Sequence, residues 1–154
     1  MHFRKHPLFS QGFYKPLNRE KYEGNPCNII YRSSWELKLF TWLDNNKNVI
    51  SWNSEEIIVP YLSPKDGKIH RYFPDCKAKM KTNNGIKTYL IEVKPQSQLE
   101  PPKKRKKVTK GYMNEVLTYA INMAKFEAAQ EYCKKRGWLW TTLNEQELFG
   151  DVKK

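Results

Sequence analysis

The sequence has few of the residues that build disulfide frameworks, cysteine-based metal clusters or membrane spans. Only three of its 154 residues are cysteines, and Cys27, Cys76 and Cys133 stand far apart without a C-x-x-C pair. This excludes a disulfide scaffold and a cysteine-based zinc site, and it fits a reducing compartment. Apolar runs extend for only a few residues, too short for a transmembrane helix. We therefore expect no membrane partner.

Acidic residues are also scarce. Sixteen Asp and Glu stand against 28 Lys and Arg, so the formal net charge is +12. A charge of this size on a small chain predicts a polyanionic partner, most simply nucleic acid. Aromatic residues, in contrast, are plentiful, with five Trp, nine Tyr and seven Phe. Such large side chains exclude disorder throughout, and the length favours one folded domain.

Composition divides the chain into three parts. Residues 1–27 are basic and rich in aromatics, Pro and Gly without periodicity, which predicts an irregular N-terminal arm packed on its own core or on a partner. Residues 28–154 carry the regular patterns of a folded domain. Within them, residues 95–112 form a basic, proline-rich insertion that is either a solvated charge run or a binding site for DNA phosphates. The candidate DNA-binding cations are Lys103, Lys104, Arg105, Lys106, Lys107 and Lys110.

Periodicity and turn residues predict a mixed order of helices and strands. Ser33 and Glu36 have the spacing of a capping box, so a helix should begin there and end at residues 45–48. Its apolar face is expected at Trp35, Leu39, Trp42 and Leu43. A long helix is expected over residues 114–136, with its apolar stripe at Leu117, Ile121, Ala124, Ala128 and Tyr132. Strands are expected at residues 49–52, 57–61, 71–80, 88–94 and 138–143, and a short helix at 144–148. The order predicts a mixed α/β fold with a small sheet flanked by helices.

The side chains that indicate chemistry are three acids and a lysine. Glu92 and Lys94 lie two residues apart on a predicted strand and so share one face, and Asp75 lies on the preceding strand. Two carboxylates close together favour a divalent cation, which predicts Mg²⁺ at Asp75, Glu92 and the Val93 carbonyl. Lys94 would then orient the attacking water. Each residue also has an ordinary structural explanation, with Glu36 as a capping acid and the others as exposed strand residues.

These residues also carry a resemblance to known nucleases. Pro74-Asp75 followed by Glu92-x-Lys94 resembles the PD-(D/E)XK nuclease superfamily, in which an upstream helical glutamate such as Glu36 is common. The stretches at residues 31–36, 49–52, 71–75 and 91–95 are similar to the TnsA-type transposon end nucleases. Residues 11–16 and 21–24 resemble the head completion nucleases of T-even-like tailed phages. The resemblance covers about residues 11–148.

The resemblance implies a restriction-endonuclease-like core and Mg²⁺-dependent hydrolysis of DNA, with Mn²⁺ able to substitute. Glu36, Asp75, Glu92 and Lys94 would be the catalytic residues of a nuclease domain over residues 28–154. Such a protein would process or secure the packaged DNA end before the neck and tail join. It would work as an endonuclease in the host cytoplasm or at the virion head and neck, with portal or neck proteins as partners. Two alternatives stay open, a DNA-binding neck protein with a silent site and a transposon end nuclease.

Overall fold

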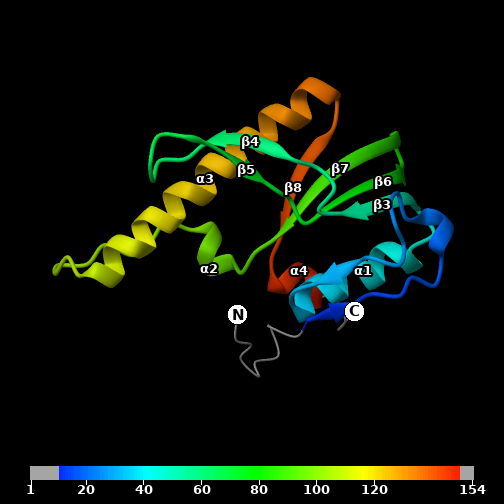
Figure 1. The fold of residues 1–154 in the computed structure, drawn as a ribbon, viewed down its shortest axis with the longest axis horizontal. Coiled ribbons are helices and arrows are strands. Elements are labelled where there is room, and N and C mark those ends of the chain that lie inside the picture. The colour runs from blue at the N-terminus through cyan, green and yellow to red at the C-terminus, as the bar shows by residue number, and fades with distance from the viewer. Residues whose placement is uncertain (1–10, 150–154) are drawn as a thin grey trace.

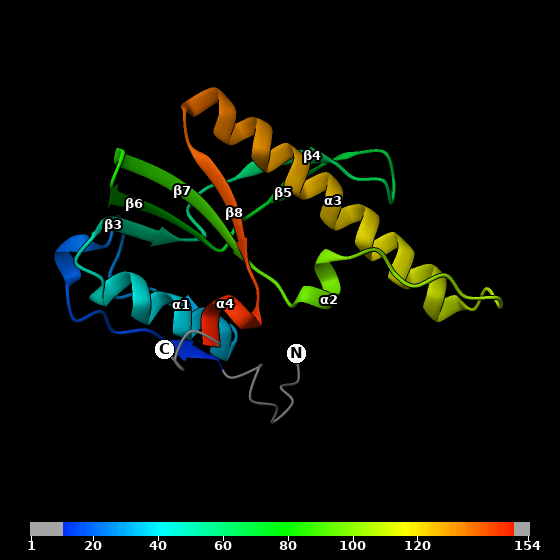
Figure 2. The same ribbon diagram turned by 180° about the vertical axis from the view of Figure 1, so that it is seen from behind.

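A four-stranded mixed sheet forms the centre of the fold. The computed structural model describes residues 11–149, and Figures 1 and 2 show the sheet with helices on both faces. The strands lie in the order β3-β6-β7-β8, antiparallel except for the parallel pair β7–β8. Their bounds are Val49–Ser54, Cys76–Thr82, Gly85–Val93 and Leu139–Leu143, respectively. This arrangement confirms the predicted mixed sheet flanked by helices.

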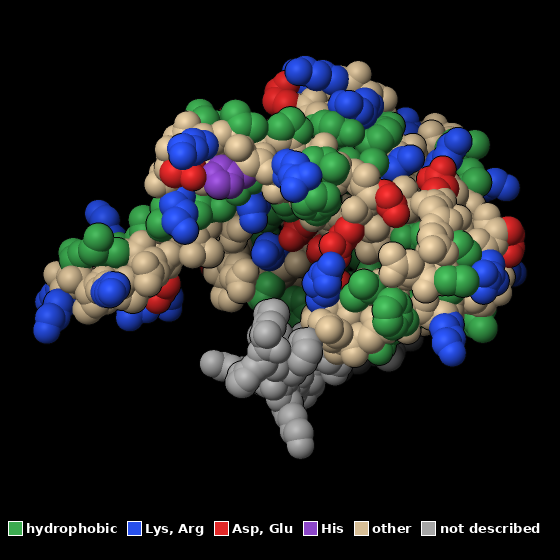
Figure 3. Space-filling view, in the orientation of Figure 1, with side chains coloured by type: hydrophobic (Ala, Val, Ile, Leu, Met, Phe, Trp, Pro, Cys, Tyr) green, Lys and Arg blue, Asp and Glu red, His purple; other side chains and the backbone are tan. Residues whose placement is uncertain are grey.

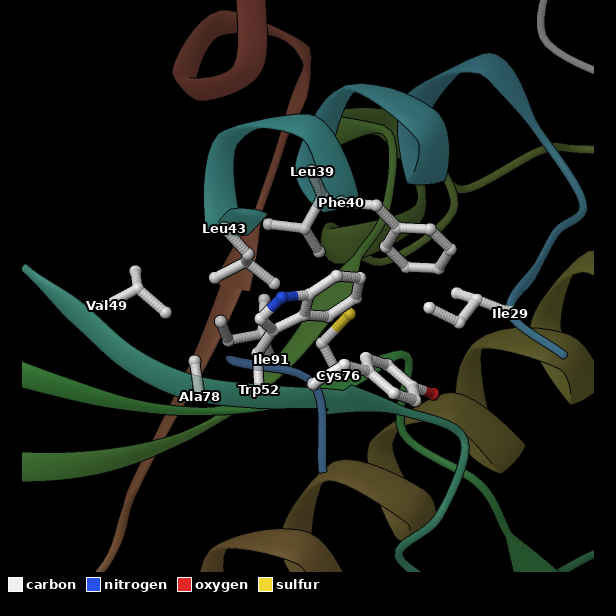
Figure 4. Packing of buried hydrophobic residues seen from close by; sticks show 10 residues of the cluster. Ile29, Leu39, Phe40, Leu43, Val49, Trp52, Cys76, Ala78 and Ile91 are labelled. Atoms are coloured by element: carbon white, nitrogen blue, oxygen red, sulfur yellow. The ribbon is translucent and has the colours of Figure 1, made fainter. Parts of the chain in front are cut away.

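Helix α1, Ser34–Asn45, covers one face of the sheet. It begins where the capping box predicts, because the Ser33 hydroxyl oxygen accepts a hydrogen bond of 3.1 Å from the Glu36 amide. Figure 4 shows its apolar side packed around Trp52, which has no exposed surface. The predicted helical face was too wide, since the Trp42 side chain is 47% exposed.

The described part of the N-terminal segment, residues 11–27, packs on this same core. The short strands β1, Gly12–Phe13, and β2, Ile30–Tyr31, pair there, and the 3-10 helix η2 follows at Arg19–Lys21. The segment is therefore less irregular than expected, and residues 1–10 of the predicted arm lie outside the described residues.

Two side chains explain why the segment stays on the core. The Tyr14 hydroxyl donates a hydrogen bond of 2.6 Å to the buried Asp44 carboxylate of α1. The Tyr22 ring packs edge-on against Trp52 with 4.8 Å between ring centroids. The aromatic residues of the segment thus contribute to the protein's own core.

Helix α3, Lys110–Arg136, crosses the opposite face of the sheet. Its side chain cap is Thr109, and Gly137 ends it in the left-handed conformation that favours glycine. The helix also packs against strand β4, Val59–Leu62, which pairs with β5, Ile69–Tyr72. The buried face of α3 lies about one residue further along the helix than the predicted stripe. Its buried residues are Asn122, Phe126, Ala129 and Cys133.

The single strand predicted over residues 71–80 is wrong. Tyr72 ends β5 and pairs with Val59 in the hairpin, whereas Cys76 begins β6 and pairs with Ile91 in the central sheet. The chain changes sheets at residues 73–75, where Pro74 is buried and has no amide hydrogen for a ladder. The break places Asp75 directly before β6 instead of within a strand.

The basic insertion is only partly a loop. Helix α2, Gln96–Leu99, follows β7, and α3 already begins at Lys110, so only Pro95 and residues 100–109 of the insertion lack regular structure. With the first turns of α3 they project from the body of the molecule (Figures 1 and 2). A short C-terminal helix, α4, spans Glu145–Phe149 beside α1. None of the described helices is long and apolar enough to span a membrane.

Candidate active site

The register of the central sheet brings Asp75 and Glu92 together. Cys76 of β6 is paired with Ile91 of β7, so the residues one step further, Asp75 and Glu92, face each other at the same end of the sheet. The Val93 amide donates a hydrogen bond of 2.8 Å to Oδ2 of Asp75 and holds that carboxylate against β7. Asp75 and Glu92, which the sequence places on different strands, thus lie next to each other.

Glu92 is buried, with 6% of its surface exposed, and is held from two sides. The Tyr72 hydroxyl donates a hydrogen bond of 2.6 Å to its Oε1, and the Lys94 Nζ lies 3.8 Å from its Oε2. Burial raises the pKa of Glu92, while the hydrogen bond from Tyr72 and the charge of Lys94 act in the opposite direction. Burial and the carboxylate also raise the pKa of Tyr72, which keeps its hydroxyl protonated as a donor.

Asp75 is an unfavourable place for a negative charge. Burial raises its pKa well above the usual range, and the negative charges of Glu92 and then Glu36 raise it further. The Val93 amide and the Lys94 ammonium lower this pKa only in part. The Asp75 carboxylate therefore lies near two other carboxylates, and a positive ion would relieve the repulsion between them.

Glu36 reaches the site from the first turn of α1. Its Oε1 accepts a hydrogen bond of 2.9 Å from the Arg32 amide, one residue before the Ser33 cap, so the capping box is shifted by one donor. Burial raises the pKa of Glu36, and the Lys94 charge lowers it. Glu36 and Lys94 also line one shared pocket. The structure therefore gives Glu36 a capping bond and a place beside the other acids at once.

The donor set fits a divalent metal ion of the magnesium type. Mg²⁺ takes oxygen ligands and is usually held by one or two carboxylates, with water and substrate phosphates completing its shell. Asp75 and Glu92 supply two such carboxylates at the buried end of the sheet. Within residues 11–149, no cluster of three or more His, Cys, Asp or Glu is positioned as a metal cage. The arrangement is therefore an open site with two carboxylates.

The predicted DNA-binding cations lie elsewhere. All six are exposed and belong to the projecting loop and the start of α3, away from the end of β7 (Figure 1). Arg105 pairs with Glu115 of α3 at 3.4 Å. Figure 3 shows acidic side chains gathered near the middle of one face, with Lys or Arg side chains next to them and on the projecting end. The structure thus separates the insertion from the acidic cluster.

Sequence reasoning missed two side chains at the site. Tyr72 was assigned to a strand without a role, yet its hydroxyl binds Glu92. Lys125 was read as part of a helix, yet its Nζ lies over the Tyr72 ring at 5.5 Å. Both contacts join residues far apart in the chain, and no local pattern signals them. The Pro74 break after Tyr72 is the only sequence feature that points to this corner.

The mixed sheet with helices on both faces is that of a restriction-endonuclease-like nuclease domain, and comparison with known proteins agrees. The family model described as "TnsA-like endonuclease N terminal" matches residues 46–145, and the chain belongs to this family. The match includes Asp75, Glu92 and Lys94, whereas Glu36 precedes it. The resemblance to TnsA-like nucleases is confirmed. The protein is a DNA hydrolase, and nucleases of this kind generally use divalent metal ions.

A curated relative narrows the resemblance further. The chain is 40% identical over 141 residues to the "Head completion nuclease" of Enterobacteria phage T4, an alignment that covers 89% of this chain and 92% of the relative. The similarity extends beyond the family match and includes most of the described residues. The roles of the individual site residues stay predictions.

Proposed function

We propose that this protein is a Mg²⁺-dependent DNA nuclease of phage head completion, which processes or secures the packaged DNA end before the neck and tail join. The observation that carries the proposal is the pair Asp75 and Glu92 at one end of the sheet, with the Lys94 ammonium 3.8 Å from Glu92. The similarity to the phage relative supports the setting. The net charge of +12 supports DNA as the polyanion.

Each site residue has a distinct task in phosphodiester hydrolysis. Asp75, Glu92 and the Val93 carbonyl would hold the metal ion, which when bound makes water more acidic and stabilises charge on the scissile phosphate. Lys94 donates hydrogen bonds to the attacking water and the phosphate oxygens, and so orients the one toward the other. Glu36 faces the same water from α1 and accepts its hydrogen bond. Mn²⁺, with similar oxygen ligands, would substitute.

Two features position these groups before DNA arrives. The Lys94 amide donates a hydrogen bond of 3.0 Å to the Leu143 carbonyl, which extends the pairing of β7 and β8 past the end of β7. The Tyr72 hydroxyl holds Oε1 of Glu92. Ligands fixed in this way lose little freedom when metal and DNA bind.

The exposed cations of the insertion would hold the DNA backbone. Lys103, Lys104, Arg105, Lys106, Lys107 and Lys110 lie on a projection, where they can meet phosphates outside the site without reading bases. Portal or neck proteins are the expected partners, and the protein would act in the host cytoplasm during assembly or at the virion head and neck.

Cleavage of linear and supercoiled DNA in Mg²⁺ or Mn²⁺ tests the proposal. The wild type is compared with Asp75→Ala and Lys94→Ala, and Lys79→Ala serves as the control because Lys79 is an exposed lysine of neighbouring β6. Metal-dependent cutting that is lost in the first two variants only, with DNA binding kept, supports the proposal. Cutting of the supercoiled form identifies an endonuclease. Tight binding without cutting under either metal would instead favour a DNA-binding neck protein with a silent site.

A further inference from the structure

Lys125 is a partly buried cation at the corner where α3, the β4–β5 hairpin and the end of β7 meet. Its Nζ lies 5.8 Å from the centre of the Tyr61 ring and 5.5 Å from that of Tyr72. Among the described residues, no carboxylate lies within ion-pair distance of this ammonium. In the described part of the chain, this ammonium is thus partly buried without an ion-pair partner.

The surroundings of Lys125 place it next to the catalytic groups. The Tyr72 ring below it carries the hydroxyl that binds Glu92. Burial and the positive charge of Lys94 lower the pKa of Lys125, and the negative charge of Glu92 raises it. Two lysines therefore lie near Glu92, one on β7 and one on α3, and the positive charge of Lys94 acts on Lys125.

The net charge of the site indicates what kind of ligand this second cation would bind. In the fully ionised site, Glu36, Asp75 and Glu92 supply three negative charges, and Lys94 and Lys125 supply two positive ones. One divalent ion changes this balance from −1 to +1, which suits a single phosphodiester. Without Lys125 the loaded site would be neutral and would attract the phosphate less.

We propose that Lys125 is a second phosphate-binding lysine of the active site, which contacts the DNA phosphodiester held next to Asp75 and Glu92. The inference rests on the proposed nuclease function. The Tyr61 and Tyr72 rings hold the ammonium by cation–π attraction and aim it without a carboxylate that would compete with the phosphate. Lys94 orients the water, and Lys125 binds the substrate from α3.

A purely structural role makes a different prediction. If Lys125 only joined α3 to the hairpin, its replacement would weaken folding and leave DNA binding per folded molecule unchanged. The test therefore uses Lys125→Met, which keeps a long apolar side chain, and Lys125→Arg, which keeps the charge. Lys134→Ala is the control because Lys134 is an exposed lysine in the last turn of the same helix.

Two measurements test the inference. The first is binding of a short fluorescent DNA duplex in buffer with Ca²⁺ in place of Mg²⁺, at several salt concentrations, where loss of one phosphate contact lowers the slope of log K against log salt by about 0.9. The second is kcat and KM for DNA cleavage in Mg²⁺, where loss of a transition-state cation lowers kcat on the order of 10²-fold. Lys125→Met should show both effects, and Lys125→Arg should restore the salt slope.

The outcomes separate the inference from the proposed function. If the wild type cuts DNA and folded Lys125→Met matches Lys134→Ala in slope and kcat, the inference is wrong and the nuclease function stands. If the wild type does not cut, the proposed function fails, and the salt slope in Ca²⁺ alone decides whether Lys125 binds phosphate. An unfolding curve for each variant shows that the compared molecules are folded.

Discussion

Removal of one hydroxyl group, by Tyr72→Phe, tests how the site holds Glu92. The hydrogen bond from the Tyr72 hydroxyl to Oε1 of Glu92 is 2.6 Å long, and both side chains are buried. A hydrogen bond to a charged group contributes about 1.5–3 kcal/mol. At about 2–4 °C per kcal/mol for a chain of this size, we expect the Tm to fall by roughly 3–12 °C.

The same change should weaken metal binding. Residues that orient a metal ligand typically account for about 10–100-fold in metal affinity or activity. The Tyr72 hydrogen bond also lowers the pKa of Glu92, so its loss raises that pKa and makes metal binding compete with a proton. Thermal unfolding and a Mn²⁺ or Mg²⁺ titration of the cleavage rate measure the two effects.

The hairpin offers a matched control, Tyr61→Phe. Tyr61 is also buried and packs on Lys125, but within the described chain its hydroxyl makes no side-chain hydrogen bond. Both substitutions keep the ring beneath Lys125, so only the bond to Glu92 differs. If Tyr72→Phe matches Tyr61→Phe in Tm and metal dependence, the Tyr72 hydroxyl does not position Glu92 and the reasoning is refuted.

Three further predictions concern pH, the N-terminal segment and the insertion. Folding raises the pKa of Asp75 and Glu92, so the folded protein binds their protons more tightly than the unfolded chain does. Without metal, the free energy of unfolding should therefore fall as pH rises from the ordinary carboxyl range through these raised pKa values. Urea unfolding at several pH values measures this dependence, and Asp75→Asn should make it weaker. Asp44→Ala removes the carboxylate that accepts hydrogen bonds from the Tyr14 hydroxyl and from the Leu17 and Asn18 amides. Urea unfolding should show a free energy of unfolding lower by about 3 kcal/mol. The control Asp66→Ala, at an exposed position, should lower it far less. Replacement of all six insertion cations by Gln should lower the salt slope of DNA binding by up to about 5 and leave the Tm unchanged; an unaltered slope would show that the insertion does not contact DNA.

Local patterns in the sequence were sufficient for several features of the site. The two-residue spacing of Glu92 and Lys94 puts them on one side of a strand whatever surrounds them, because side chains alternate along β structure. Ser33 determines where α1 begins, since its hydroxyl oxygen caps the first turn. Each of these features depends on neighbours a few residues away, and the structure agrees with them.

Other features depend on partners far apart in the chain. Asp75 lies at the start of a strand because β5 and β6, on either side of Pro74, belong to different sheets. Periodicity alone predicted one continuous strand there. The rotation of α3 is set by what it packs against, so Phe126 faces the core where the stripe predicted Ala124 and Ala128.

The amino-acid sequence by itself predicted the class of chemistry, because three acids, a lysine and their order along helix and strands are typical of a metal-assisted nuclease site. Only the tertiary structure decided how that site is held and completed. Tyr72 reaches Glu92 across 20 positions, and Lys125 lies on α3, whose packing against the β4–β5 hairpin brings it over the Tyr72 ring. A local pattern encodes which way a side chain points from its own element, whereas the side chain it meets depends on how the elements pack.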